Sequence, residues 1–293
     1  FVGKQALAAV GAAFPLIFVL IALVIGIGMG FSIVISQFFG AKQMDKVERT
    51  IDTMWIFLLG TSILVTIVGI VFSRRILELT GLPADVLPLA TTYLQIYLAG
   101  TIMFFGFNGM TSLLRGLGDS KTPLWFLIIA TLANIVLDLL FVLVFHWDVA
   151  GVAWATVISQ TGAFLTMVLY INKTHQVIKL KFRKYVWDNE LFKKSFKIGF
   201  PTGLQQTFVS LGMLAVYGIV NGFGTDVVAA YSAAGRLDSF AMMPAMNFAA
   251  ALSSFVGQNI GANRPDRVRR GLIATLKMTT YISVAVTIIF YFL

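Results

Sequence analysis

The stretch VISQFFGAKQMDKVER, residues 34–49, returns later in the chain as FVGQNIGANRPDRVRR, residues 255–270. The identical pairs, each separated by 221 positions, include Gln37 and Gln258, Gly40 and Gly261, Ala41 and Ala262, and Asp45 and Asp266. Both copies end an apolar run and enter a basic loop, so the two copies have the same orientation. A parallel repeat of this kind is expected of transporters whose halves are related by an axis along the membrane normal.

The composition around the repeat is that of a membrane protein. Of the 293 residues, 58% are hydrophobic and 12% are charged, with a mean hydropathy of +0.87, whereas soluble domains have about 25% charged residues. Apolar runs longer than about 18 residues predict transmembrane helices, and they lack the alternation of a transmembrane β-barrel. We therefore predict an all-α polytopic membrane protein. Its eight predicted spans are residues 8–38, 50–72, 89–114, 122–145, 150–172, 196–220, 228–258 and 272–293.

The charges of the loops alternate along these spans. The loops at 39–49, 115–121, 173–197 and 261–270 contain 3, 2, 8 and 4 Lys or Arg residues, and the opposite set contains Lys4, Arg74 and Arg75. This asymmetry predicts that the basic loops are cytoplasmic. It also accounts for the net charge of +9, so nucleic acid is not expected as a partner. The absence of cysteine excludes disulfides and Cys-ligated metal sites.

The repeat also predicts how this chain relates to a complete architecture, which would have twelve helices in two parallel six-helix lobes. We predict an N-lobe at residues 1–172 without its first helix, a cytoplasmic linker at 173–195, and a partial C-lobe at 196–293 without its last three helices. Both ends are expected to be cut, because FVGKQALAAVG is not a signal peptide and the chain stops inside the apolar run TIIFYFL. The second half of the linker is expected to be either solvated or a short amphipathic helix, with Tyr185, Trp187 and Phe192 at the headgroup level.

A carboxylate lies inside the apolar run ANIVLDLLFVL, residues 133–143. Asp138 is roughly two-thirds of the way across its predicted span at about 1.5 Å per residue, where an acid costs about 2.5–3.5 kcal/mol and usually faces a functional cavity. Asn134 is one helical turn earlier on the same face. In a functional role, the pair provides oxygen ligands for Na⁺, or Asp138 carries a proton. In a structural role, Asp138 only forms hydrogen bonds between helices. Asn108 is a candidate additional polar contact, or else an interhelical hydrogen bond.

Several longer motifs resemble those of the multidrug and toxic compound extrusion (MATE) transporters, and most closely the bacterial DinF-like branch. They are LLRGLGDSKTP (113–123), NIVLD (134–138), DVAGVAWATVISQ (148–160), KIGFPTGLQQ (197–206) and AGRLDSFAMMPAMNFAAALSSFVGQNIGA (234–262). The resemblance implies an antiporter in the plasma membrane of a bacterium, with two lobes that form a V and alternate between outward- and inward-open states. It implies export of organic, often cationic compounds in exchange for Na⁺ or H⁺, without a cofactor.

The resemblance also implies which residues form the cation site. In this sequence the site would comprise Asn134, Asp138, Thr156 on the next span and Tyr93 on the preceding one, with Na⁺ held by the first three. The family site has a further Asp on the first helix, which this chain does not contain, so the site in this chain is expected to be incomplete.

Candidate residues for an organic substrate lie in the second half of the chain. Met242 and Met246, near Pro244, offer soft apolar contacts for a drug, or else pack against lipid or other helices. Gln205 and Gln206 follow Pro201 and are candidates to face the C-lobe cavity. The substrates are expected to be small organic molecules, and the protein is expected to be a monomer in the bilayer.

Other readings are less well supported by the residues. A flippase of lipid-linked saccharides, in the same superfamily, predicts a cationic cavity, whereas the first half offers an acid and no deep Arg or Lys; a channel or receptor-like scaffold is a third alternative. No nucleophile and base, metal cluster or acid pair indicates an enzyme, and GLGD at 116–119 lacks the Lys-Ser/Thr of a phosphate-binding loop. In GIGMG, residues 26–30, the two outer glycines form a G-x-x-x-G that predicts close helix packing.

Overall fold

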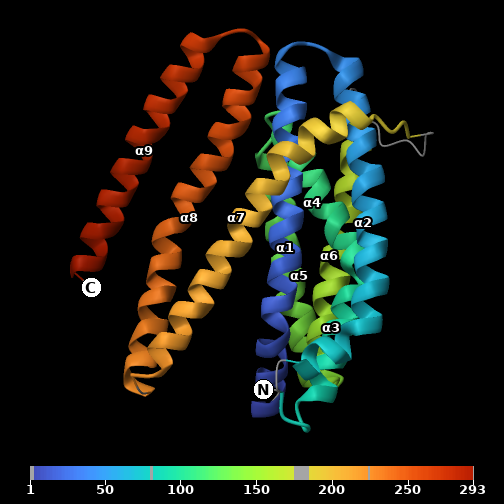
Figure 1. Cartoon of the computed structure of the whole chain (residues 1–293), viewed down its shortest axis with the longest axis vertical. Helices are drawn as coiled ribbons and strands as arrows, with labels where there is room; N and C mark the ends of the chain where they lie inside the picture. Colours follow the sequence, from blue (N-terminus) through green and yellow to red (C-terminus); the bar gives the residue numbers. More distant parts are fainter. Residues whose placement is uncertain (1–2, 80–81, 175–184, 224, 293) are drawn as a thin grey trace.

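The computed structural model describes residues 3–79, 82–174, 185–223 and 225–292, and in these ranges all regular elements are helices. They are α1 (Gly3–Gly40), α2 (Met44–Leu79), α3 (Leu87–Ala99), α4 (Thr101–Gly116), α5 (Lys121–Leu139), the π-helix η1 (Leu140–Val144), α6 (Asp148–Thr174), α7 (Asn189–Asn221), α8 (Thr225–Gly261) and α9 (Pro265–Phe292). Helices α1–α6 form one bundle, and α7–α9 form an arm that meets the bundle at one end and diverges from it toward the other (Figure 1).

Membrane-spanning character is clear for most of these helices. Among the described residues, five helical segments are long and apolar enough to cross a bilayer: α1, α2, α5 with η1, α6 and α9. A sixth is added if α3 and α4 are counted as one span. Helices α7 and α8 are 33 and 37 residues long but are not among the segments that meet this measure. The predicted spans at 196–220 and 228–258 therefore depend on helix length and on the arrangement beside α1.

The third predicted span, residues 89–114, is not one straight helix. It breaks at Gly100, where α3 and α4 meet at an angle of 49°. Glycine at this position allows close packing, because a Cβ on Gly100 would lie 2.5 Å from Cγ2 of Val157 on α6. The backbone at the bend is further held by the Thr66 hydroxyl, which donates to the carbonyl of Leu98 at 3.0 Å.

Of the two alternatives for the second half of the linker, the structure shows no separate short helix at residues 185–188, and residues 175–184 lie outside the described part. Residues 185–188 have no regular structure, and the helix that follows is α7 itself. The Asp188 carboxylate accepts from the backbone N–H of Glu190 and Leu191, so it caps α7 at this point. The backbone N–H of Asp188 in turn donates to the Thr53 hydroxyl at 3.1 Å, which fixes the start of α7 on α2.

The turn at the end of each repeat copy is built in the same way. Helix α1 ends at Gly40 and α2 begins at Met44, while α8 ends at Gly261 and α9 begins at Pro265. The residue with left-handed backbone is Lys42 (φ 59°) in the first turn and Asn263 (φ 54°) in the second, again 221 positions later. The closing hydrogen bonds also repeat: the Gln43 N–H donates to the Phe38 carbonyl, and the Arg264 N–H donates to the Asn259 carbonyl. This is the pattern of a Schellman motif.

Helix α1 is the contact between bundle and arm. Where it crosses α7, a Cβ on Gly26 would meet the backbone of Gly203, and a Cβ on Gly30 would meet the backbone of Ser195 and Gly199. The predicted close packing at Gly26 and Gly30 is therefore confirmed, and its partner is a second G-x-x-x-G on α7. Glycine on both sides lets the two backbones touch, which is how small residues bring membrane helices together.

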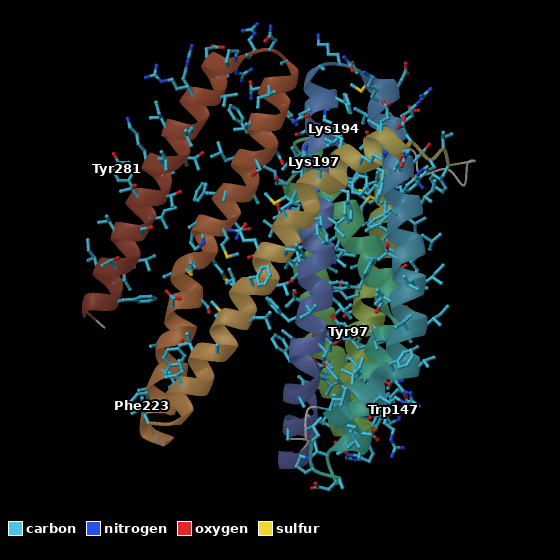
Figure 2. All side chains as sticks on the ribbon, viewed as in Figure 1. Tyr97, Trp147, Lys194, Lys197, Phe223 and Tyr281 are labelled. Carbon is cyan, nitrogen blue, oxygen red and sulfur yellow. The ribbon has the colours of Figure 1, made fainter. Side chains whose placement is uncertain are left out.

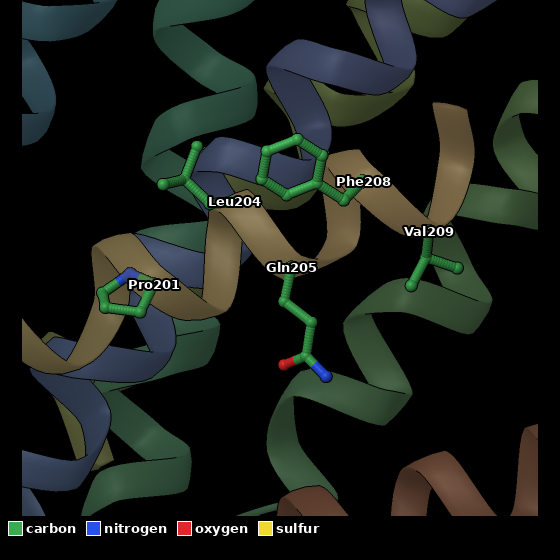
Figure 3. A pocket seen from close by; sticks show the side chains of 5 residues that line it. All are labelled: Pro201, Leu204, Gln205, Phe208 and Val209. Atoms are coloured by element: carbon green, nitrogen blue, oxygen red, sulfur yellow. The ribbon is translucent and has the colours of Figure 1, made fainter. Parts of the chain in front are cut away.

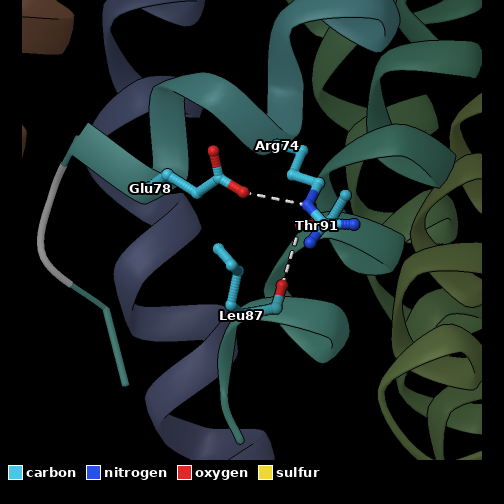
Figure 4. Close-up of polar contacts among 4 residues, drawn as sticks. All are labelled: Arg74, Glu78, Leu87 and Thr91. Carbon is cyan, nitrogen blue, oxygen red and sulfur yellow. Dashed lines mark hydrogen bonds and ion pairs between the residues drawn. The ribbon is translucent and has the colours of Figure 1, made fainter. Parts of the chain in front are cut away.

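The two ends of the molecule differ in charge. Lys194 and Lys197 lie at the end where bundle and arm meet, and Tyr97 and Trp147 lie toward the opposite end of the bundle (Figure 2). We call the first end, with the turns 41–43, 117–120 and 262–264, the basic face; it is the predicted cytoplasmic side. At the opposite end, Arg74 pairs with Glu78 at 2.9 Å, and the nearby Thr91 hydroxyl donates to the Leu87 carbonyl (Figure 4).

Candidate functional site

Asp138 is held near the end of α5, directly before the π-helix η1. Its side chain is half-buried, and the Oδ1 atom is buried without a hydrogen-bond partner among the described residues. A buried carboxylate oxygen without a donor is unfavourable, so the site is suited to a ligand that supplies positive charge. A π-turn inside a helix commonly marks a functional position, and here Phe141, at its inner side, stacks on Trp147 at a ring distance of 4.9 Å.

Asn134 and Thr156 come together beside this acid. The Asn134 Nδ2 lies 3.5 Å from the Thr156 Oγ1, and the Thr156 hydroxyl donates to the Val152 carbonyl at 3.1 Å. The threonine proton is thus directed to its own helix, which leaves its oxygen as the acceptor. This contact ties α5 to α6 and orients an amide and a hydroxyl oxygen within the same helix pair as Asp138.

Tyr93 completes the group from α3. It is buried, with 8% of its surface exposed, and the charge of Asp138 acts on its phenol. Its ring lies 6.5 Å from that of Tyr97, one turn later on α3. The bend at Gly100 lets α3 approach α6, so the position of Tyr93 beside Asp138 depends on the packing of Gly100 on Val157.

Asn108 does not join this group. It lies beyond the bend, about four helical turns after Tyr93, and its Nδ2 donates to the Phe104 carbonyl of its own helix at 2.9 Å. The structure therefore joins Asn134 to Thr156, one helical turn from Asp138, and places Tyr93 on α3, which packs against α6. Asn108 lies apart from them.

The predicted substrate residues are dispersed. Gln205 lines an open hollow of about 590 Å³ on α7 together with Pro201, Leu204, Phe208 and Val209 (Figure 3). Met242 and Met246 are exposed on α8 and do not line this hollow, and neither does Gln206. The lining consists of apolar side chains and one amide on an open face of α7.

The described part of the chain has no group of three or more His, Cys, Asp or Glu residues that could hold a metal ion. Within this chain, a cation at Asp138 would be held by that carboxylate and by neutral oxygens. Such hard oxygen ligands suit Na⁺ rather than a transition metal.

The sequence matches the MatE family over residues 1–140 and 201–293. The chain belongs to the MatE family. This is a family of transporters rather than enzymes, and the protein is a multi-pass membrane protein. The probable multidrug resistance protein YoeA of Bacillus subtilis is a MatE-like relative, 35% identical over 275 residues. The alignment covers 92% of this chain and 59% of YoeA, so the chain spans about three-fifths of that relative's length.

Solved structures agree with this assignment. A multidrug resistance MATE family transporter of the MOP superfamily, in an outward-facing conformation, superposes with a TM-score of 0.90 at 26% identity. The match covers 97% of this MatE chain and 64% of that one. A MOP superfamily transporter from Pyrococcus furiosus, in which reverse polarity of the binding pocket suggests a different function, has a TM-score of 0.90 at 25% identity, with the same coverage of 97% and 64%.

Proposed function

We propose that the protein is a secondary active antiporter that exports organic, often cationic compounds in exchange for Na⁺ or H⁺. We further propose that it acts as a monomer in the plasma membrane of a bacterium, with an N-lobe at residues 1–172 and a partial C-lobe at 196–293. The observation that carries this proposal is the unpartnered, buried oxygen of Asp138 beside Tyr93 and the Asn134–Thr156 pair.

The coupling follows from the energetics of that carboxylate. An ionised acid within a membrane span is unfavourable by about 2.5–3.5 kcal/mol on insertion scales, and either a proton or Na⁺ relieves this penalty. Ion binding therefore lowers the free energy of the conformation in which Asp138 is most deeply buried. A ligand that binds one conformation better shifts the population toward it, which is the requirement for exchange of an ion against a substrate.

The polarity of the bundle favours an organic cation over an anionic, saccharide-linked lipid. The sequence from Thr122 to Asn172, which covers α5 after its first residue, η1 and nearly all of α6, contains Asp138 and Asp148 but no Lys or Arg. A flippase for lipid-linked saccharides, the second candidate, needs cations to bind its diphosphate. We expect relatives with a pocket of the opposite polarity to differ at these positions.

The test is efflux of ethidium or norfloxacin from proteoliposomes that contain the whole protein, under a Na⁺ gradient and, separately, a H⁺ gradient. Asp138→Asn should abolish gradient-driven efflux, since the amide neither binds Na⁺ with a charge nor exchanges a proton. Asp148→Asn is the matched control, because Asp148 is exposed at the start of α6 and its left-handed backbone, φ 52°, tolerates Asn. Undiminished efflux by Asp138→Asn would overturn the role of this acid. Binding of lipid-linked saccharides without efflux would favour the flippase.

A further inference from the structure

Gln258 connects the arm to the bundle by a single side chain. Its Nε2 donates to the backbone carbonyl of Gly116 at 3.1 Å. Gly116 is the last residue of α4, and carbonyls in the last turn of a helix lack an intrahelical partner. Gln258 on α8 therefore completes the end of a helix in the other part of the molecule.

The backbone beyond Gly116 is shaped to receive this side chain. Gly118 has φ +92°, in the left-handed region, and a Cβ there would lie 3.0 Å from Gln258 Nε2. Any other residue at 118 would be strained in this conformation and would also crowd the amide. The turn after α4 is thus a backbone cradle for Gln258.

The cradle is within reach only because α8 touches α1. A Cβ on Gly40 would meet the backbone of Gln258, a Cβ on Gly257 would meet the Ser36 side chain, and a Cβ on Gly261 would meet the backbone of Gln37. With glycine at these positions, the two backbones lie in direct contact. If α8 moved away from α1 by a few ångströms, the hydrogen bond from Gln258 to Gly116 would be lost.

These contacts lie on the basic face, at the end where arm and bundle meet, while the arm diverges from the bundle at the opposite end (Figure 1). A transporter that alternates between its two faces has to separate this junction when it opens toward the basic side. Gly26 and Gly30, where α1 crosses α7, add backbone contact between bundle and arm. The hydrogen bond from Gln258 exists only when the junction is closed.

We infer that Gln258 is a positioning residue that stabilises the state closed on the basic face, by binding the free carbonyl at the end of α4. The inference rests on the proposed transport function, because only an alternating protein has a second state to disfavour. Gln258 then contributes to the balance between the two states, and through it to the rate at which the binding site is presented to the basic side. Removing it leaves the Gly116 carbonyl without its donor, which penalises the closed state selectively.

The experiment measures that balance directly. Because this chain has no cysteine, spin labels at Ser120→Cys and Arg264→Cys, both exposed on the basic face, report the distance between bundle and arm once any cysteine elsewhere in the whole protein is replaced by serine. Distances are measured by pulsed electron resonance on the whole protein in lipid nanodiscs, with no substrate and no gradient. Gln258→Leu should raise the ratio of separated to closed forms about five- to tenfold.

The matched control is Asn247→Leu. The Asn247 amide donates to the Met243 carbonyl within α8, so this variant removes the same kind of donor without touching the bundle, and the distance distribution should not change. Gln258→Glu is a second variant of nearly the same shape that lacks the donor when ionised, and it should act in the same direction as Gln258→Leu. An unchanged distribution in both Gln258 variants, or an equal shift in Asn247→Leu, would overturn the inference.

The outcome is separable from that of the transport test. If the protein moves no ethidium or norfloxacin but the two Gln258 variants still shift the distance distribution, the proposed substrate class is wrong and the role of Gln258 stands. If efflux depends on Asp138 but the distances do not shift in the Gln258 variants, the proposed transport function stands and the role of Gln258 is wrong. In transporting protein, loss of this contact should change the maximal rate with little effect on the substrate concentration at half-maximal rate, as expected of a residue that touches no substrate.

Discussion

Gly100→Ala tests whether the bend between α3 and α4 positions the acid's neighbours. The added Cβ would lie 2.5 Å from Cγ2, 2.8 Å from Cγ1 and 3.1 Å from Cβ of Val157, whereas carbon atoms normally pack at about 3.5–4.0 Å. The overlap of about 1 Å involves both methyl groups of a stiff, β-branched side chain, so rotation does not relieve it. Separation of α3 from α6 should reduce the free energy of unfolding by about 1–3 kcal/mol and should move Tyr93 away from Asp138.

A double-mutant cycle gives this prediction its test. Val157→Ala removes both crowded methyl groups, so it should be destabilising alone but should restore part of what Gly100→Ala loses, with a coupling energy of about 1–2 kcal/mol. Gly60→Ala is the control, because a Cβ on Gly60 meets nothing within 4 Å. Stability is measured by titration with a denaturing detergent, and ion-driven efflux is measured in parallel. A coupling energy of zero would show that the bend is not held by this contact.

Three further predictions concern the site and the start of α7. Thr156→Val should weaken Na⁺ or proton coupling about tenfold, since it removes the hydroxyl oxygen that faces the Asn134 amide. Thr161→Val is its control in the efflux assay. It loses a similar hydrogen bond to its own helix and should leave coupling intact. Asp188→Ala should lower stability by about 1 kcal/mol and Asp188→Asn by less, as expected for loss of an N-cap, in the same detergent titration. Burial and the nearby Asp52 raise the pKa of Tyr185, so the folded protein loses stability as the pH rises above the pKa of this phenol in the unfolded chain. Asp52→Asn should lower the pKa of Tyr185 in an ultraviolet titration.

The sequence predicted the helical class, most span positions and the repeat, because each leaves a local signal. Apolar runs specify helices in lipid, and the copied turn after residue 40 carries the same backbone in both places. The break at Gly100 was missed because YLAGTIMFF reads as one apolar run. Glycine alone does not end a membrane helix, and this one bends where Val157, far along the chain, packs against it.

For the candidate site, the sequence offers residues that remain a prediction. Asn134 and Asp138 stand out within an apolar run, and the resemblance supplied Thr156 and Tyr93. The contact partners in the arm were not predictable, because Gln258, Gly199 and Gly203 acquire their roles only from the way α7 and α8 cross α1. The π-turn after Asp138 also has no sequence signal of its own. The stacking of Phe141 on Trp147 offers a tertiary reason for it.

The crossing of α1 and α8 has a consequence for what each half of the protein tolerates. Ser36 and Gly257 occupy the same place in the two repeat copies, and they touch each other across the junction. Because these two equivalent positions contact each other, the space between α1 and α8 limits the combined volume of their two side chains rather than the volume of either one. The first copy has serine at this place, and the second has glycine, which has no side chain. The two halves therefore differ at this contact, because serine in both copies would force α1 and α8 apart.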